Sequence, residues 1–593
     1  MRRLPLVVLV AAALLAACTP AGPSTDSRPS DAPYLDPSLA VQERVADLLA
    51  RMELADKVGQ MTQAERGVAR PADVTRFRLG SVFSGGGSAP ADNSPEGWAD
   101  MVDGLQAGAL ATPLGIPLLY GVDAVHGHQL LHGATVFPHN IGLGATGDPD
   151  LVERIAAATA VEVAATGANW NFAPCVAVVQ DVRWGRTYES FGEDPALVTA
   201  MTSSVSGYQG TILATAKHYL GDGGTADGVD QGDVRLSEAE LRATHLQPYV
   251  AAIERGVRSV MVSFSSWNGV KSHGDEHLIT DLLKGELGFT GFVVTDWAGI
   301  DQIDGEPGFS AAEVAQAINA GIDMVMVPND YELFIETLTG AVESGEVPIE
   351  RIDDAVSRIL TVKFEMGLFE DPLTDRSLAD RVGSAEHRAL AREAVAKSAV
   401  LLTNDGVLPL AAGSRVLVAG SNADDIGNQS GGWTMTWQGA SGDIIPGTTI
   451  LEGLRDRLDV EYSRDGTADY ADVDVAIAVV GEVPYAEYEG DRPDGVLLSD
   501  EDQATLARLQ ASGLATVVVV VSGRPMDIAE HLWASAIVAA WLPGSEGGGI
   551  ADVLTGEAPF VGTLPVTWPR STAAGGRGPA LFPLGHGLSS SVG

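Results

Sequence analysis

Short apolar runs that alternate with amphipathic stretches dominate the chain from about residue 40 to residue 370. The runs are rich in Val, Ile and Leu and lack a regular alternation of apolar and polar side chains, which is typical of parallel strands buried on both faces of a sheet. Helical spacing predicts a helix over residues 151–166, and capping boxes that begin at Ser237 and Ser310 predict two more. The predicted strands are residues 116–122, 170–174, 211–216, 259–264, 291–295 and 324–327.

This alternation predicts the fold class α/β, with a (β/α)8 TIM-like barrel over residues 39–370. The competing interpretation is a doubly wound open sheet, but no Gly-rich phosphate-binding loop follows the first predicted strand. Residues 371–396 are predicted to be a linker that contains a helix, and residues 397–590 a smaller α/β sandwich domain. The strands of this second domain are predicted at 415–419, 475–480, 516–521 and 536–541, with a helix at 498–512.

The N-terminal residues have the pattern of an export signal. Two arginines precede an apolar stretch, residues 4–15, that is too short to span a membrane, and Leu15-Ala16-Ala17-Cys18 follows. We therefore predict a signal peptide over residues 1–17. The last four residues resemble a bacterial lipobox, which implies a lipidated Cys18 and a flexible tether over residues 18–38; the alternative is a plain secretory signal. The prediction is an exported lipoprotein, anchored to a bacterial cell membrane on its periplasmic or extracellular face, with the lipid as its only membrane contact.

The chain is strongly acidic, with a formal net charge of −42 over 593 residues. Such a surface repels phosphate backbones and acidic polymers, so nucleic acid is not predicted as a partner and a neutral substrate is. The two cysteines are Cys18, in the lipobox, and Cys175, so no disulfide framework is predicted. The sequence gives no indication of the oligomeric state.

Ionisable and aromatic residues stand where the predicted barrel strands end. Because a barrel gathers the carboxyl ends of its strands on one face, these side chains are predicted to line a common pocket. The sequence has no HExxH, no CxxC, no His/Asp triplet with metal spacing and no Gly-x-Ser-x-Gly elbow, so we predict no metal, no cofactor and no serine nucleophile. The predicted pocket residues are Asp123, Arg186, Lys217, His218, Asp296 and Trp297.

Six motifs stand in order along the chain: residues 120–127 (YGVDAVHG), 183–189 (RWGRTYE), 217–225 (KHYLGDGGT), 291–297 (GFVVTDW), 522–525 (SGRP) and 540–547 (AWLPGSEG). Together they resemble the signature of glycoside hydrolase family 3. The resemblance covers about residues 40–590, and it is greatest to the two-domain β-glucosidases and β-glucan exohydrolases of that family.

The resemblance implies a retaining mechanism, in which two carboxyl groups stand about 5 Å apart. Asp296 matches the nucleophile, although Thr295 precedes it where the family usually has a serine. Glu487 matches the acid/base best, with Glu482 and Glu489 as neighbouring alternatives. This role requires the second domain to pack over the pocket of the first.

The resemblance also implies how the sugar is held. Four residues match the groups that bind the terminal sugar: Asp123, Arg186, Lys217 and His218. Asp227 and Asp230, in the loop that follows, are weaker candidates. Trp297 and Trp437 match two tryptophans that sandwich the next sugar, and stacking of this kind tolerates different linkages because it contacts the ring faces.

The predicted function is that of a retaining, exo-acting β-glucosidase or β-glucan glucohydrolase, which releases glucose from the non-reducing end of neutral β-linked gluco-oligosaccharides. The open alternatives are a β-xylosidase or β-N-acetylglucosaminidase of the same family, and a non-catalytic sugar-binding lipoprotein. Residues 221–223 are Gly-Asp-Gly, where N-acetylglucosaminidases usually have Gly-His-Gly, which argues against acetamido sugars. The presence of both predicted catalytic carboxyl groups argues against a binding protein.

Overall fold

The computed structural model describes residues 31–574 and 578–589. The predicted signal peptide and Cys18 lie outside these residues. Among the described residues, no helix combines the length and the apolar character that crossing a membrane would require.

The N-terminal half of the described chain forms a closed barrel of eight parallel strands. Two groups of paired strands, β11-β1-β2-β3-β4 and β10-β7-β5, are joined by parallel bridges between Trp170 and Leu213 and between Val294 and Met324. The strands are β1 (Thr62–Glu65), β2 (Ser81–Ser84), β3 (Leu119–Val122), β4 (Trp170–Asn171), β5 (Thr215–Tyr219), β7 (Ser259–Val262), β10 (Phe292–Val294) and β11 (Val325–Met326). The predicted (β/α)8 barrel is therefore confirmed, and the open doubly wound sheet is excluded.

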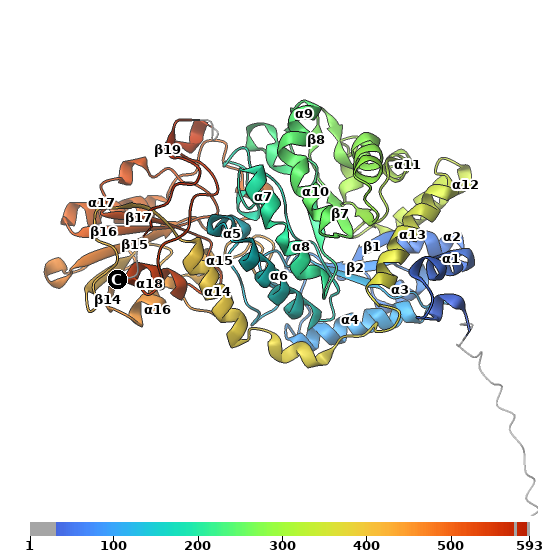
Figure 1. The fold of residues 1–593 in the computed structure, drawn as a ribbon, viewed down its shortest axis with the longest axis horizontal. Helices are drawn as coiled ribbons and strands as arrows, with labels where there is room; N and C mark the ends of the chain where they lie inside the picture. Colours follow the sequence, from blue (N-terminus) through green and yellow to red (C-terminus); the bar gives the residue numbers. More distant parts are fainter. Residues whose placement is uncertain (1–30, 575–577, 590–593) are drawn as a thin grey trace, which may run out of the picture.

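Helices connect successive strands and cover the outside of the barrel (Figure 1). The helix predicted at 151–166 is present as α6, and the capping boxes at Ser237 and Ser310 open α9 (Glu238–Leu241) and α11. The main covering helices are α1 (Val41–Arg51), α3 (Pro71–Phe77), α4 (Pro95–Leu110), α6 (Pro149–Ala164), α8 (Ser203–Gln209), α10 (Gln247–Glu254), η7 (His277–Glu286), α11 (Ala311–Ala320), α12 (Tyr331–Ser344) and α13 (Ile349–Glu365).

The prediction of a strand at 211–216 was wrong in its boundaries, because β5 begins only at Thr215. Residues 212–214 are as apolar as a strand, but they lead into the barrel from α8, and only Leu213 among them bridges a neighbouring strand. As a consequence Lys217 and His218 lie within β5, whereas the sequence had placed them after it.

The C-terminal domain is a six-stranded sheet in the order β12-β17-β16-β15-β13-β14, parallel except for the antiparallel edge strand β12. In Figure 1, α17 (Asp500–Ser512) lies on one side of this sheet, and α16 (Ile450–Arg455) and α18 (Gly548–Thr555) lie on the other. The predicted α/β sandwich is thereby confirmed. Its strands are β12 (Val400–Asn404), β13 (Arg415–Ala419), β14 (Asp459–Tyr462), β15 (Val475–Gly481), β16 (Ala515–Val521) and β17 (Ala536–Trp541).

The helix α14 (Ala385–Ser398) connects the two domains and contacts both of them. It packs against α6 and α5 (Asn140–Thr146) of the barrel and against α18 of the sandwich. His387 of α14 is 2.6 Å from Glu162 in the barrel, and Arg392 forms an ion pair with Asp552 on α18 at 2.6 Å. These contacts hold the domains side by side, so that loops of the sandwich reach the barrel's carboxyl-end face.

Candidate active site

Lys217 and Asp123 meet at the carboxyl-end face of the barrel. Lys217 lies in β5 and Asp123 directly follows β3. The Lys217 ammonium donates to Oδ1 of Asp123 at 3.1 Å, and the two side chains are only 2% and 13% exposed. The same ammonium lies 5.8 Å from the ring centre of Trp433, which comes from the sandwich domain. A buried ammonium with a carboxylate and an aromatic face beside it is well suited to bind hydroxyl groups.

Arg186 joins the barrel to the second domain. Its guanidinium donates to Glu189 at 2.8 Å, to Oε1 of Glu487 at 3.2 Å and to Nε2 of His218 at 3.2 Å. Burial raises the pKa of Glu189, but the charges of Arg186 and Lys217 outweigh it and hold the pKa below its usual value. Arg186 is therefore a buried cation that contacts groups from three separate segments.

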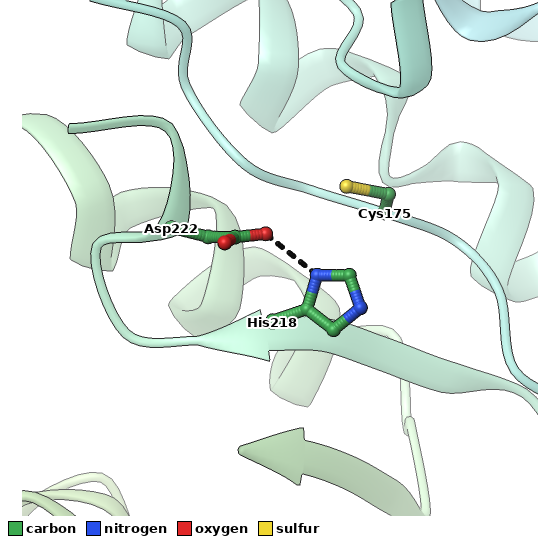
Figure 2. Close-up of side chains that lie close together, drawn as sticks. All are labelled: Cys175, His218 and Asp222. Carbon is green, nitrogen blue, oxygen red and sulfur yellow. Dashed lines mark hydrogen bonds and ion pairs between the residues drawn. The ribbon is translucent and has the colours of Figure 1, made fainter. Parts of the chain in front are cut away.

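His218 is held as a neutral ring. Its Nδ1 lies 2.6 Å from Oδ2 of Asp222, as Figure 2 shows, and its Nε2 accepts from Arg186, so Nδ1 carries the hydrogen. Burial, followed by the nearby charge of Arg186, lowers the pKa of His218 well below its usual value. Burial raises the pKa of Asp222 to about 6.

Cys175, His218 and Asp222 place their ligand atoms within 4.8 Å of one another, which raises the question of a metal ion (Figure 2). A metal would have to displace the hydrogen bond between His218 and Asp222. Burial also raises the pKa of the Cys175 thiol to about 12. The described hydrogen bond is the one between Asp222 and His218, which orients the His218 ring.

Asp296 lies just after β10, and its carboxylate is next to the His218 ring. Its main-chain N–H donates to Nε2 of His273 at 3.1 Å, and its Oδ1 accepts from the main-chain N–H of Trp297 at 2.7 Å. Oδ2 is buried, lies 3.5 Å from Nε2 of His218 and has no hydrogen-bond partner among the described residues. One oxygen of Asp296 is thus oriented by the backbone and the other is left available to a ligand.

Glu487 reaches Arg186 from the loop that follows β15 in the sandwich domain. It is connected to Asp296 through two side chains, because Arg186 contacts Glu487 and His218, and His218 contacts Asp296. Burial raises the pKa of the Glu487 carboxyl to about 8; Arg186 acts in the opposite direction, and the charge of Asp296 adds to the rise. This carboxyl therefore keeps its proton at neutral pH.

The two neighbouring glutamates have different surroundings. Glu482 forms an ion pair with Arg524 at 3.0 Å and accepts from the hydroxyl of Tyr485 at 3.0 Å. The side chain of Glu489 is exposed to solvent. Of the three predicted candidates for the acid/base, only Glu487 is in contact with Arg186.

Trp297 and Trp437 approach the same glycine-rich loop, which follows β2. A Cβ atom on Gly85 would lie 2.8 Å from the Trp297 ring, and one on Gly86 would lie 2.9 Å from Cβ of Trp437. The absence of side chains on this loop allows both tryptophans to lie against it. Trp297 is 43% exposed, and the Trp437 ring meets Tyr488 edge-on with ring centres 5.6 Å apart. One exposed indole ring, that of Trp297, and one half-buried ring, that of Trp437, therefore lie beside this loop.

The structure brings all eight predicted site residues to one region and adds four that the sequence did not single out, namely Glu189, Asp222, His273 and Trp433. Glu189 and Asp222 lie within motifs 183–189 and 217–225, so the motifs contained a signal that was not used. Trp433 lies in a Gly-rich segment of the second domain, and its ring N–H donates to Glu189 at 3.2 Å across the domain interface. Asp230 is buried and accepts from the indole of Trp184, whereas the carboxylate of Asp227 is exposed.

A buried carboxyl with a raised pKa, a second carboxylate with a free oxygen and two nearby indole rings together suit an enzyme that cleaves glycosidic bonds. Comparisons with known proteins agree. The model of the glycosyl hydrolase family 3 N-terminal domain matches residues 53–362, and that of the C-terminal domain matches residues 399–590. The chain therefore belongs to glycoside hydrolase family 3 and is a glycoside hydrolase.

Individual relatives match over most of the chain. It is 34% identical to a lysosomal beta glucosidase of Dictyostelium discoideum, over 92% of this chain and 75% of that protein. It is 30% identical to a periplasmic beta-glucosidase of Salmonella typhimurium, over 89% of this chain and 74% of that protein. The crystal structure of an exo-1,3/1,4-beta-glucanase from a Pseudoalteromonas species superposes with a TM-score of 0.88 at 42% identity, covering 93% of this chain and 74% of that one.

Proposed function

We propose that this enzyme is an exo-acting β-glucosidase that releases one glucose at a time from the non-reducing end of β-linked gluco-oligosaccharides, with retention of the anomeric configuration. The observation that carries the proposal is the pairing of Asp296, which keeps a free carboxylate oxygen, with Glu487, whose pKa is raised to about 8 and which is linked to Asp296 by contacts through Arg186 and His218. The beta-glucosidase and exo-beta-glucanase relatives support the choice of glucose.

In the proposed reaction Asp296 attacks the anomeric carbon, and a covalent glycosyl-enzyme forms as the bond to the leaving oxygen breaks. Glu487 gives its proton to that oxygen. Glu487, now a carboxylate, then takes a proton from water, which attacks the anomeric carbon and releases both the sugar and Asp296. The two roles suit the two environments, because Asp296 offers a free oxygen and Glu487 is protonated at neutral pH.

The proposed binding roles follow from the chemistry of the surrounding groups. Lys217 with Asp123, and Arg186 with His218, provide charged or polarised partners for the hydroxyl groups of the terminal glucose. Trp297 and Trp437 are proposed to stack on the faces of the next sugar. No step in this scheme requires a cofactor or a metal ion.

The experiment that tests this function is a panel of aryl β-glycosides and glucose disaccharides, with NMR observation of the first anomer formed. We expect the highest kcat/KM with the β-glucoside, β-glucose as the first product, and rates with β-1,3 and β-1,4 disaccharides that differ by less than about tenfold, because stacking discriminates weakly between linkages. An α-anomer as first product would contradict the retaining mechanism, and a marked preference for one linkage would contradict the tryptophan assignment.

One relative favours a second candidate function, that of a β-xylosidase. The chain is 29% identical to a protein named beta-xylosidase from Formosa agariphila over 93% of this chain. Xylose lacks the hydroxymethyl group of glucose, so the two candidates are separated by kcat/KM on the matched aryl β-xyloside and β-glucoside in the panel. A higher value with the xyloside would replace glucose with xylose in the proposal.

We also propose that the protein is exported and lipid-anchored through Cys18. The relatives named as periplasmic support export, and the Leu-Ala-Ala-Cys sequence supports the anchor. In a bacterial host, the wild-type protein should partition into the detergent-rich phase of a phase-separating detergent and incorporate labelled palmitate. The Cys18→Ser variant should do neither. Equal partitioning of both proteins into the aqueous phase would contradict the anchor while leaving export and catalysis intact.

A further inference from the structure

Arg524, in the motif at residues 522–525, has no role in the scheme above, although it is completely buried between the two domains. It follows β16 of the sandwich, and its five N–H groups all have acceptors. Nε and Nη2 donate to Oε1 of Glu482 at 3.2 and 3.0 Å. Nη1 donates to the carbonyl oxygens of Arg183 and Trp184 at 3.0 and 3.3 Å, and Nη2 also donates to that of Gly490 at 2.7 Å.

These bonds join the two segments that carry the reacting groups. Residues 183–184 belong to the barrel loop that continues into Arg186, and Gly490 ends the short helical turn that begins with Glu487. The guanidinium of Arg524 also lies 4.6 Å from the ring centre of Tyr485, two residues before Glu487. Arg524 therefore contacts the chain on both sides of Glu487 without contacting Glu487 itself.

Further contacts hold this loop against the barrel. The carboxylate of Asp491 accepts from the main-chain N–H groups of Gly185 and Asp230, both at 2.9 Å. The hydroxyl of Tyr188 donates to the carbonyl oxygen of Tyr485 at 2.7 Å. The approach is close, since a Cβ atom on Gly185 would lie only 1.8 Å from the carbonyl oxygen of Glu487.

Glu487 needs such support because its backbone is in the left-handed region, with φ of 54°. A residue other than glycine in this conformation costs about 1–3 kcal/mol and persists only where the surrounding structure imposes it. The surrounding contacts come from Arg524 and Asp491, which hold the loop around Glu487 against the barrel. If they were loosened, Glu487 would be expected to relax and move its carboxyl away from the leaving oxygen.

We propose that Arg524, paired with Glu482, is a positioning residue that fixes the acid/base carboxyl of Glu487 against the barrel. The inference rests on the proposed function of Glu487 and adds to it that proton transfer depends on a buried arginine in the second domain. Arg524 acts through the loop and touches no sugar. Its loss should therefore affect the steps that need Glu487 much more than attack by Asp296.

The test compares two substrates that differ in their need for an acid. Cellobiose has a poor leaving group and requires protonation, whereas 2,4-dinitrophenyl β-glucoside has a leaving group acidic enough to depart alone. In Arg524→Lys and Glu482→Gln, we expect kcat/KM for cellobiose to fall by about 10²-fold, the scale of a small misplacement of a reacting group. We expect kcat/KM for the dinitrophenyl glucoside to stay within about threefold of wild type, because its first step needs no proton donor. Azide should raise kcat on this substrate and yield β-glucosyl azide.

The matched control is Arg392→Lys, which alters the ion pair between α14 and α18 away from the loop. It should lower the melting temperature, but kcat/KM for cellobiose and kcat/KM for the dinitrophenyl glucoside should change by the same factor. Asp491→Asn, just beyond the turn, provides a further variant if Arg524→Lys does not fold. Equal losses on both substrates, or no loss on either, would overturn the positioning role. Failure of the wild-type enzyme to hydrolyse either glucoside would instead overturn the proposed function.

Discussion

Replacement of Asp296 by alanine is expected to abolish turnover, lowering kcat for an aryl β-glucoside by at least about 10⁴-fold, the scale seen when a catalytic nucleophile is removed. The oxygen that would bond to the anomeric carbon is Oδ2, which is buried and has no hydrogen-bond partner among the described residues. Steady-state rates and the melting temperature of the purified variant would be measured together. Because Asp296 forms only one side-chain hydrogen bond among the described residues, to the adjacent main-chain N–H, stability should change little.

Asp304→Ala is a suitable control for Asp296→Ala. Asp304 lies in the segment that follows the same barrel strand, a few residues further along the chain, but it is exposed, and its carboxylate accepts from the main-chain N–H of Glu306. The variant should retain the wild-type rate. Turnover by Asp296→Ala close to the wild-type rate would exclude Asp296 as the nucleophile.

Replacement of Glu487 by glutamine is expected to lower kcat/KM for cellobiose by about 10²- to 10⁴-fold, the usual contribution of a general acid. The loss should be much smaller for 2,4-dinitrophenyl β-glucoside. The wild-type pH profile should also change, because burial raises the pKa of Glu487 to about 8. The reaction needs the protonated form, which is present below that pKa and lost above it, so wild-type kcat/KM for cellobiose should decline as pH rises through about 8. The glutamine variant should lack this decline.

Glu489→Gln provides the matched control, since Glu489 lies two residues away and is exposed. Its pH profile and its rates on both substrates should match wild type. If instead Glu489→Gln or Glu482→Gln abolished the decline and Glu487→Gln kept it, the acid/base would have to be reassigned within this loop.

The apolar runs of the sequence were sufficient to predict both domains, because strands buried on two faces must be continuously hydrophobic. β15 and β16, which are almost entirely Val, Ile and Ala, were predicted to within a residue or two. β1 and β2 were missed because their sequences, Thr-Gln-Ala-Glu and Ser-Val-Phe-Ser, contain inward-facing polar groups. Gln63, for example, is fully buried; its amide nitrogen donates to the hydroxyl of Ser81 at 2.8 Å, whereas its amide oxygen has no hydrogen-bond partner among the described residues.

The sequence was sufficient to predict the barrel residues of the site, but it did not identify the acid/base within its loop. Asp296 and Lys217 stand at or near strand ends, so the barrel topology alone indicated that they meet. The identity of the acid/base among Glu482, Glu487 and Glu489 could not be decided from composition, because the loop is acidic throughout. The difference depends on their contacts, since Glu487 meets Arg186 of the barrel and Glu482 meets Arg524 of its own domain. Contacts between segments so far apart in the chain leave no periodic pattern in the sequence.

The central claim is that the barrel carboxylate attacks the sugar and the sandwich carboxyl supplies the proton. Its most direct test is to trap the glycosyl-enzyme with 2,4-dinitrophenyl 2-deoxy-2-fluoro-β-glucoside, digest the protein and locate the added sugar by mass spectrometry. We predict a single modification, on Asp296, that accumulates as activity is lost and that Asp296→Ala does not acquire. Modification of Glu487 or Asp222 instead, or complete inactivation with Asp296 unmodified, would contradict the account.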